Sequence, residues 1–396
     1  GGNMYKIQTL NKISAIGLNN FPRDNYEIAS EFQNPDAVIV RSFGMLEMDI
    51  PASVKSIARA GAGVNNIPIP KCTEKGIVVF NTPGANANAV KELVFAGMFL
   101  SARNLFDSMK WTESVKGKGD EVPKLVEKEK SKFAGSEIRG KTLGVIGLGA
   151  IGVMVSNDAI AMGMNVIGFD PYISVDNAWG LDSKVHKAIS LDHLLSESDY
   201  ITVHVPLTDG TRGMFNAEKF KLVKDGAVLL NFSRGGLINN ADLKAAIESG
   251  KIKCHVTDFP EEELISSKGI ICLPHLGAST EEAEDNCAVM AVKQTKDFLE
   301  TGNIKNSVNF PDCDLPFSNK CRLIIANKNV PNMVGQITTR LAEKGINISD
   351  MINKHKGEIA YNIIDLDTVI TDEQLAKIKA IDGIIMVRFL ENPNQK

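Results

Sequence analysis

The segment TLGVIGLGAIG constrains the fold more than any other stretch of this chain. Gly147, Gly149 and Gly152 have the spacing GxGxxG, directly after an apolar run that predicts a strand and before a segment that predicts a helix. In such a turn the first glycine permits a tight bend and the second lets a pyrophosphate approach the backbone. The third lets the helix pack against the strand. The segment therefore predicts a βα unit that binds a dinucleotide.

The residues around this turn indicate which dinucleotide binds. Ala150 and Ile151 begin the predicted helix, so their free N–H groups are expected to face the phosphates. The next predicted strand, NVIGFD, ends in Asp170, and an acid at this place accepts hydrogen bonds from the ribose hydroxyls. No Lys or Arg follows in DPYISVDNAW, so a 2′-phosphate would face a carboxylate without a cation. NAD is therefore the expected cofactor, in preference to NADP.

A chain of 396 residues predicts two or three domains. Continuous apolar runs at residues 13–18, 36–42, 56–61 and 76–81 predict a parallel sheet buried on both faces. A second series of seven strands follows: TLGVIG, NVIGFD, KVHKA, YITVHV, AVLLNF, KCHVTDF and IICLP. The last 77 residues read strand, helix, strand, strand, helix, strand, which is a ferredoxin-like βαββαβ pattern.

The predicted fold class is therefore α/β, with two open parallel-sheet domains, one flavodoxin-like and one of Rossmann type, and a small ferredoxin-like domain. The charged stretch 117–135 predicts a surface excursion, either a solvated linker or a functional segment, and a helix is expected at 281–301. The expected domains are residues 4–87 with 285–310 for the substrate, 88–284 for NAD, a linker at 311–319 and a final domain at 320–396.

Composition excludes several classes of protein. The net charge of −4 gives no electrostatic footprint for nucleic acid or an acidic membrane. No run of 18 apolar residues predicts a membrane span, and the first residues lack the apolar core of a secretory signal. The six cysteines form no CxxC pair or Cys/His cluster, so neither a metal site nor a disulfide framework is expected. A cytoplasmic protein is the expectation.

Three predicted strands of the second domain end in side chains that bear on catalysis. Arg234 follows AVLLNF, Asp258 ends the run that leads into the glutamates 261–263, and His275 follows IICLP. Ligands of open α/β sheets bind at this carboxyl edge. Arg is a bidentate partner for a carboxylate, and a carboxylate that hydrogen-bonds an imidazole fixes its tautomer. Each residue alone is also compatible with a plain surface position.

In this order, the glycine turn with Asp170, NFSRGG, TDFPEEE and PHLGAST resemble the D-isomer 2-hydroxyacid dehydrogenase family, over residues 4–310. VRSFG, RAGAGVNNI and NTPGANANAVKEL resemble substrate loops of the branch that acts on 3-phosphoglycerate. Residues 320–396 resemble an ACT domain, a small-molecule regulatory module. Only residues 311–319 precede that module, so the intervening domain of the longest family members is expected to be absent.

The resemblance implies roles for individual residues. His275 corresponds to the general acid/base, Arg234 to the arginine that clamps the substrate, and Asp258 to an aspartate near the nicotinamide carboxamide. The residues that correspond to substrate contacts, or are candidates for the substrate phosphate, are Arg41, Ser42, Arg59, Asn86, Lys130 and Lys132.

The implied reaction is the NAD-dependent oxidation of 3-phospho-D-glycerate to 3-phosphohydroxypyruvate, the first step of the phosphorylated route to L-serine. Glu262 corresponds to the glutamate that orients His275 if one residue is deleted after Asp258, and Glu261 and Glu263 remain alternatives. One alternative function is a D-2-hydroxyacid dehydrogenase for glycerate, hydroxypyruvate or D-lactate. Another is an NAD-sensing binding protein like the family's transcriptional corepressors.

The resemblance also implies partners. A homo-oligomer, either a dimer or a tetramer, is expected, in which Lys130 and Lys132 reach the substrate phosphate of the neighbouring subunit. Two solvated lysines are the alternative. Asn329 and Asn347 correspond to positions that bind L-serine in regulated relatives, so L-serine is the expected effector. A purely structural dimerisation unit is the alternative for this module.

Overall fold

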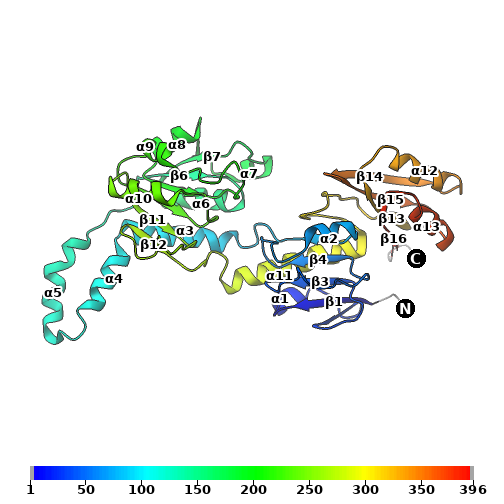
Figure 1. The fold of residues 1–396 in the computed structure, drawn as a ribbon, viewed down its shortest axis with the longest axis horizontal. Coiled ribbons are helices and arrows are strands. Elements are labelled where there is room, and N and C mark those ends of the chain that lie inside the picture. Colours follow the sequence, from blue (N-terminus) through cyan, green and yellow to red (C-terminus); the bar gives the residue numbers. More distant parts are fainter. Residues whose placement is uncertain (1–3, 393–396) are drawn as a thin grey trace. The chain divides into compact units, whose positions relative to one another are not determined.

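The computed structural model describes residues 4–392 and divides the chain into two compact units (Figure 1). The first unit comprises residues 1–85 with 284–396, and the second comprises residues 86–283. Helix α11 (Glu281–Thr301) confirms the helix predicted at these residues, and all but its first turn belongs to the first unit.

The first unit contains a five-stranded parallel sheet with the order β2-β1-β3-β4-β5, which is the order of flavodoxin-like folds. Its strands are β1 (Tyr5–Leu10), β2 (Tyr26–Ala29), β3 (Ala37–Val40), β4 (Ser56–Arg59) and β5 (Val78–Phe80). The apolar runs in β3 and β5 are fully buried, as expected for strands that are covered on both faces. Helix α2 (Ile69–Glu74) connects β4 to β5, and the strands predicted at 36–42, 56–61 and 76–81 are confirmed.

The strand predicted at residues 13–18 is wrong. This segment holds the short helix α1 (Ala15–Leu18), and the first strand is β1 instead. Ser14 caps the helix, because its Oγ accepts a hydrogen bond at 3.3 Å from the N–H of the second helical residue. The helix packs closely on α11, because a Cβ on Gly17 would lie 2.5 Å from the Cβ of Ala288. Ile13 and Leu18 belong to the apolar core that α11 shares with β1 and β3.

The second unit contains a seven-stranded parallel sheet with the order β12-β11-β10-β9-β6-β7-β8. This is the Rossmann order with one further strand, and all seven predicted strands are confirmed. They are β6 (Thr142–Ile146), β7 (Asn165–Phe169), β8 (His186–Lys187), β9 (Tyr200–Val203), β10 (Ala227–Asn231), β11 (Ile252–Thr257) and β12 (Ile270–Cys272).

Helices cover both faces of this sheet and form two apolar cores. One core includes residues of α3 (Ala87–Ala102) and α6 (Ala150–Ala161). The other includes residues of α8 (Leu191–Glu197), α9 (Ala217–Leu222) and α10 (Asn240–Glu248), while the short α7 (Val175–Gly180) has no buried residue.

The segment between α3 and β6 is a helical excursion that Figure 1 shows extending away from the sheet. It consists of α4 (Leu105–Ser114), η1 (Gly119–Glu121), α5 (Val122–Glu129) and η2 (Lys130–Phe133). None of these four helices contains a buried residue. The surface excursion predicted at residues 117–135 is therefore confirmed, and its structure is helical.

The C-terminal module, residues 320–392, forms the antiparallel sheet β14-β15-β13-β16 with two helices on one face. Its elements are β13 (Cys321–Lys328), α12 (Met333–Ala342), β14 (Ile348–Lys356), β15 (Ile359–Leu366), α13 (Asp372–Lys379) and β16 (Ile384–Glu391). This is the predicted βαββαβ pattern. The other face of the sheet shares one apolar core with β1, β5 and α11.

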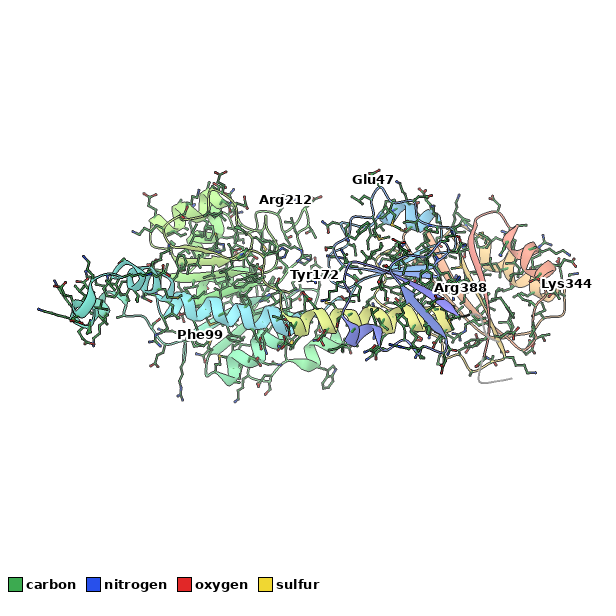
Figure 2. All side chains as sticks on the ribbon, turned by 90° about the horizontal axis from the view of Figure 1, so that it is seen from below. Glu47, Phe99, Tyr172, Arg212, Lys344 and Arg388 are labelled. Atoms are coloured by element: carbon green, nitrogen blue, oxygen red, sulfur yellow. The ribbon has the colours of Figure 1, made fainter. Side chains whose placement is uncertain are left out.

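Two buried arginines fasten this module to α11. Arg322 forms a bidentate ion pair with Asp365, with N–O distances of 2.6 and 3.0 Å, and its Nη1 donates to the carbonyl of Thr301 at 2.9 Å. Arg388, labelled in Figure 2, donates to the carbonyls of Phe298 and Leu299 at 3.2 and 2.8 Å. A cation at the C-terminal end of a helix is favoured by the helix dipole. The module is therefore an integral part of the first unit.

Candidate functional site

The glycine turn after β6 has the geometry that its spacing predicts. Gly147 has a φ of +88°, and a Cβ there would lie 2.3 Å from the carbonyl oxygen of His204. A Cβ on Gly152 would lie 2.0 Å from the carbonyl oxygen of Gly147, so both positions exclude any side chain. Gly149 precedes the first residue of α6, and the space around its Cβ position is open. The turn thus leaves room for a ligand at the N-terminus of the helix.

Asp170 is bound to this turn by its carboxylate. Its Oδ2 accepts a hydrogen bond from the N–H of Leu148 at 2.8 Å, and its Oδ1 accepts one from the N–H of Tyr172 at 2.8 Å. Asp170 is half-buried, and each oxygen keeps a second acceptor position. The carboxylate is therefore fixed beside the glycine turn, where it can accept hydrogen bonds from hydroxyl groups.

Asp258 and His275 meet at the carboxyl ends of β11 and β12. Asp258 is fully buried; its carbonyl accepts from the N–H of His275 at 2.9 Å, and its Oδ2 accepts from the N–H of Gly277 at 2.9 Å. Its Oδ1 is buried without a partner among residues 4–392, and burial raises the pKa of Asp258. His275 has a φ of +46° and its ring contacts the ring of Phe259 at 4.9 Å between centroids. Asp258 thus shapes the loop that presents an exposed imidazole.

Arg234 lies in the turn after β10. The side chain of Asn231 closes this turn, because its Nδ2 donates to the carbonyl of Arg234 at 2.9 Å and its Oδ1 accepts from the N–H of Ser233 at 3.1 Å. The guanidinium of Arg234 is exposed and donates to the carbonyl of Ser233 at 2.7 Å. It has no ion-pair partner among residues 4–392, so it can bind an anion.

The three glutamates after β11 differ in their contacts. Glu261 and Glu263 accept hydrogen bonds from the side chain of Asn240 at 3.0 and 2.8 Å, and Glu263 also pairs with Lys244 at 3.1 Å. Glu262 is exposed and makes no side-chain hydrogen bond within the described residues. In the same residues, none of the three bonds to His275. Two of the alternatives are therefore held on α10, which leaves Glu262 as the candidate partner.

The remaining predicted substrate residues belong mainly to the first unit. Arg41 pairs with Glu284 at 2.5 Å, and the backbone N–H of Ser42 donates to Asn11 at 2.9 Å. The guanidinium of Arg59 donates to the carbonyls of Arg41 and Gly63, and burial lowers its pKa. These contacts order the loops that contain Arg41 and Arg59.

Three other sets of predicted residues lie elsewhere. Asn86 is the half-buried N-cap of α3, at the start of the second unit. Lys130 and Lys132, on η2, are exposed and pair with the neighbouring Glu127 and Glu129. Asn329, after β13, donates from Nδ2 to the carbonyl of Gly357 at 3.3 Å, and Asn347 is exposed between α12 and β14. The second unit thus brings together the glycine turn, Asp170, Asp258, His275 and Arg234 at one sheet edge.

His204 also lies at this edge, although no sequence motif pointed to it. It follows β9, its Nε2 lies 2.9 Å from the Oγ1 of Thr202, and its Nδ1 is buried without a partner among the described residues. Burial lowers the pKa of His204 to about 4, so the ring is neutral at pH 7. Its place in the sequence could have predicted this position, because His204 lies near the carboxyl end of the predicted strand YITVHV, and Arg234 and His275 follow the ends of theirs.

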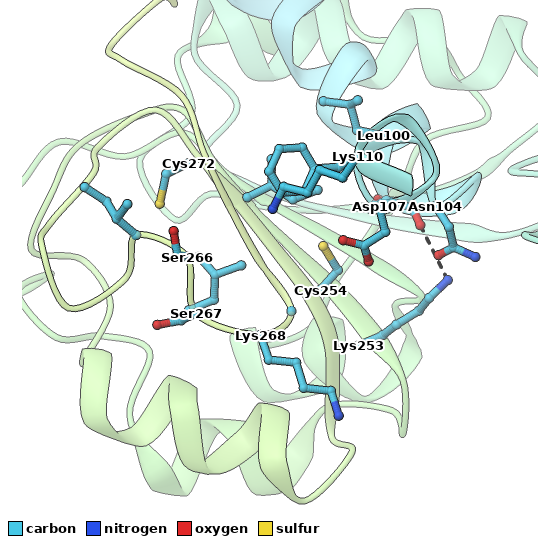
Figure 3. Close-up of a pocket in the computed structure, with 16 residues that line it drawn as sticks. Leu100, Asn104, Asp107, Lys110, Lys253, Cys254, Ser266, Ser267, Lys268 and Cys272 are labelled. Carbon is cyan, nitrogen blue, oxygen red and sulfur yellow. Dashed lines mark hydrogen bonds between the residues drawn. The ribbon is translucent and has the colours of Figure 1, made fainter. Parts of the chain in front are cut away.

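A pocket of about 340 Å³ in the second unit lies at the opposite sheet edge (Figure 3). It surrounds the amino ends of β11 and β12, and Lys253 in its wall donates to the carbonyl of Ser101 at 3.4 Å. Open α/β sheets bind their ligands at the carboxyl ends of the strands. This pocket is therefore separate from the candidate site. Among the described residues there is no cluster of three potential metal ligands, and no helix is long and apolar enough to cross a membrane.

Comparison with known proteins agrees with this geometry. Residues 95–277 match the family model "D-isomer specific 2-hydroxyacid dehydrogenase, NAD binding domain". The chain is 36% identical over 349 residues to D-3-phosphoglycerate dehydrogenase of Methanocaldococcus jannaschii, which covers 86% of this chain and 63% of that protein. It is 38% identical over 280 residues to hydroxypyruvate reductase of Thermotoga maritima, which covers 67% of this chain and 85% of that protein.

A solved structure is also similar. The NAD+-bound 3-phosphoglycerate dehydrogenase of Entamoeba histolytica matches with a TM-score of 0.58 and 26% identity, over 77% of this chain and 99% of that chain. The chain spans 63%, 54% and 54% of the lengths of three D-3-phosphoglycerate dehydrogenases that it matches. The Thermotoga relative, in contrast, is matched over most of its length. Sequence, fold and strand-end residues therefore agree that this chain belongs to the D-isomer specific 2-hydroxyacid dehydrogenase family.

Proposed function

We propose that this chain catalyses the NAD-dependent oxidation of 3-phospho-D-glycerate to 3-phosphohydroxypyruvate, the first step of the phosphorylated route to L-serine. The observation that carries the proposal is that Arg234, Asp258 and His275 follow three neighbouring strands, at the sheet edge that also holds the glycine turn. The similarity to enzymes named for 3-phosphoglycerate in Methanocaldococcus jannaschii and Entamoeba histolytica supports the choice of substrate.

The residues present fit NAD. The open space at Gly149 and the N–H groups of Ala150 and Ile151 would hold the pyrophosphate, and Asp170 would hold the adenosine ribose. The unpartnered Oδ1 of Asp258 offers an acceptor to the amide of a nicotinamide. When bound, NAD supplies the acceptor for the hydride that leaves C2 of the substrate.

Three side chains serve the chemical step in this proposal. His275 accepts the proton of the C2 hydroxyl, a task that suits an imidazole because its ordinary pKa lies near neutral pH. Glu262 orients the imidazole and stabilises its protonated form. Arg234 binds the substrate carboxylate and polarises the C2 oxygen, and its exposed, unpaired guanidinium supports this role.

The substrate phosphate requires further cations. Ser42 and Asn86 are proposed as polar contacts, and Arg41 as a phosphate ligand that would exchange its ion pair with Glu284 for the phosphate. Arg59 is proposed as a second phosphate ligand. Because its guanidinium already donates to the carbonyls of Arg41 and Gly63, its contacts favour an indirect role, in which it positions the loop that carries Arg41. This proposal makes the loop of the first unit the part that distinguishes a phosphorylated from a plain hydroxyacid.

We further propose a cytoplasmic homo-oligomer, a dimer or a tetramer, in which Lys130 and Lys132 contact the phosphate in the neighbouring subunit. Helix α4 beside them exposes the apolar side chains of Leu105 and Met109, and exposed apolar surface of this kind is what a second copy can cover. L-serine is the proposed effector, bound by Asn329 and Asn347 between paired modules. Inhibition requires that serine binds the inactive arrangement more tightly. Initial rates measured against L-serine should fall for the parent and be less sensitive in Asn329→Ala; equal sensitivity of the two would exclude Asn329 from the site.

A substrate panel tests the function directly. The formation of NADH should be measured with 3-phosphoglycerate, glycerate and D-lactate, and its consumption with hydroxypyruvate. The proposal expects 3-phosphoglycerate to give the highest kcat/KM. A preference for hydroxypyruvate would favour the second candidate, a small-substrate reductase, which the similarity to the Thermotoga maritima hydroxypyruvate reductase supports. NAD binding without turnover of any of the four would indicate an NAD-sensing protein.

A further inference from the structure

A cavity of about 940 Å³ lies within the first unit, between helix α2 and the C-terminal module. The module contributes the turn after β13 and the turn between β14 and β15 to its wall. Its size falls in the range of small-molecule sites, roughly 300–1,000 Å³. None of the catalytic or cofactor residues proposed above lines it; Asn329 alone, from the proposed effector site, lies in its wall.

The two walls of this cavity are held together by close contacts. A Cβ on Gly76, in the turn that follows α2, would lie 2.7 Å from the Cβ of Met386 on β16, so this turn and the strand meet at a position that tolerates no side chain. On the other side, Nζ of Lys356 donates to the carbonyl of Ser307 at 3.0 Å. The N–H of Asn329 donates to the carbonyl of Glu358 at 2.7 Å and joins the two turns of the module. The cavity is therefore bounded by fixed elements.

The charges in the wall are balanced. Lys328 and Lys356 supply two ammonium groups, and Glu74 and Glu358 supply two carboxylates. None of the four forms an ion pair within residues 4–392. A purely anionic ligand would face the two carboxylates, and a purely cationic ligand would face the two ammonium groups. A zwitterion places each of its charges opposite a group of the other sign.

The rest of the wall is largely apolar. Ile69 and Pro70 on α2, Val308 before the module and Ile385 on β16 line it together. The buried amide of Asn309 is already saturated, because its Nδ2 donates to Thr73 and to the carbonyl of Ile77. This wall therefore offers contact area to an apolar side chain, and the polar recognition comes from the charged groups.

We propose that this cavity binds a free α-amino acid with an apolar side chain of about the size of leucine. Its ammonium group contacts Glu74 or Glu358, its carboxylate contacts Lys328 or Lys356, and its side chain lies on the apolar wall. This site shares Asn329 with the serine site proposed above, but it needs only one chain, because α2 and the module of the same chain form its walls. A ligand here bridges α2 and the module of one chain, and so strengthens the contact between them.

The test is isothermal titration calorimetry of the full chain with L-leucine, in the absence of NAD and substrate. We expect binding that weakens at least about tenfold for 4-methylpentanoate and for 3-methylbutylamine, each of which lacks one charge. Glu74→Gln and Lys328→Gln should each weaken L-leucine about tenfold. Glu27→Gln and Lys344→Gln, exposed positions of the same unit outside the cavity, are the matched controls and should leave binding unchanged.

Three outcomes would overturn the proposal. L-leucine fails to bind, or it binds with the same affinity to the cavity variants and the controls, or inorganic phosphate or AMP binds better than L-leucine and is weakened by Lys328→Gln. The last result would show that the cavity takes an anion. Because the titration contains neither cofactor nor hydroxyacid, its failure says nothing against the proposed dehydrogenase activity, and loss of that activity says nothing against this site.

Discussion

Asp365→Asn should destabilise the first unit strongly. The change removes the negative charge that neutralises Arg322, whose side chain is 0% exposed, while that of Asp365 is 1% exposed. The guanidinium then retains the carbonyls of Thr301 and Pro316 as acceptors but lies in the interior without a counter-charge. Water cannot replace the lost carboxylate at a position so deeply enclosed.

The magnitude follows from this burial. Removal of one partner from a buried ion pair costs about 3–5 kcal/mol of unfolding free energy, because the other charge remains desolvated. A unit of this size loses about 2–4 °C of melting temperature per kcal/mol, so a shift of roughly 6–20 °C is expected. Asp365→Leu combined with Arg322→Met should recover most of the loss, since an apolar pair of similar volume removes both charges.

Differential scanning calorimetry measures the effect, and Glu373→Gln provides the control. Glu373 forms an exposed pair with Lys377 in the same module, 76% and 50% exposed, and its loss should leave the melting temperature unchanged. If Asp365→Asn melts together with the parent and the control, Arg322 is not an uncompensated buried charge. The stabilising role of the buried Arg322–Asp365 pair would then be refuted.

Three further predictions concern the second unit. Asp170→Ala should weaken NAD binding with less effect on turnover at saturating NAD, and unchanged affinity in a fluorescence titration would contradict the ribose contact. Burial lowers the pKa of His255 from 6.5 to about 4, so on acidification the unfolded chain binds the proton before the folded chain does. The unfolding free energy that the neutral ring contributes is therefore fully present above pH 6.5 and falls by about 3 kcal/mol as the pH drops to 4. The unfolding free energy measured in urea should depend less on pH in His255→Asn than in the parent. The same pH dependence in both proteins would refute the role of His255. Lys130→Ala with Lys132→Ala should raise KM for 3-phosphoglycerate and spare KM for NAD, whereas an unchanged KM would support two solvated lysines.

The sequence predicted the second unit better than the first. The strands β6 to β12 are continuous apolar runs between turns, and the glycine turn follows the first of them. The apolar pattern and the glycine motif therefore predict the same parallel sheet. At residues 13–18 an equally apolar run forms a helix, because its partners are on α11, far along the chain. A local pattern cannot reveal that its apolar face belongs to a distant helix.

Individual site residues show the same division. Gly147, Gly152 and Asp170 were predictable because their roles depend on backbone geometry within one βα unit. The contacts that hold Glu261 and Glu263 on α10 arise from tertiary structure, so sequence alone left three glutamates open. The hydrogen bonds from Arg59 to the carbonyls of Arg41 and Gly63 could not be predicted either, because they also depend on the tertiary structure.

The most direct test of the proposed activity is the steady-state oxidation of 3-phosphoglycerate by the parent, His275→Ala and the control His186→Ala, an exposed histidine on β8. NAD binding should be measured in parallel. The proposal predicts that His275→Ala lowers kcat about 10²–10⁴-fold with nearly unchanged NAD affinity, and that His186→Ala behaves as the parent. Parental turnover in His275→Ala would contradict the assignment of His275 as the catalytic acid/base.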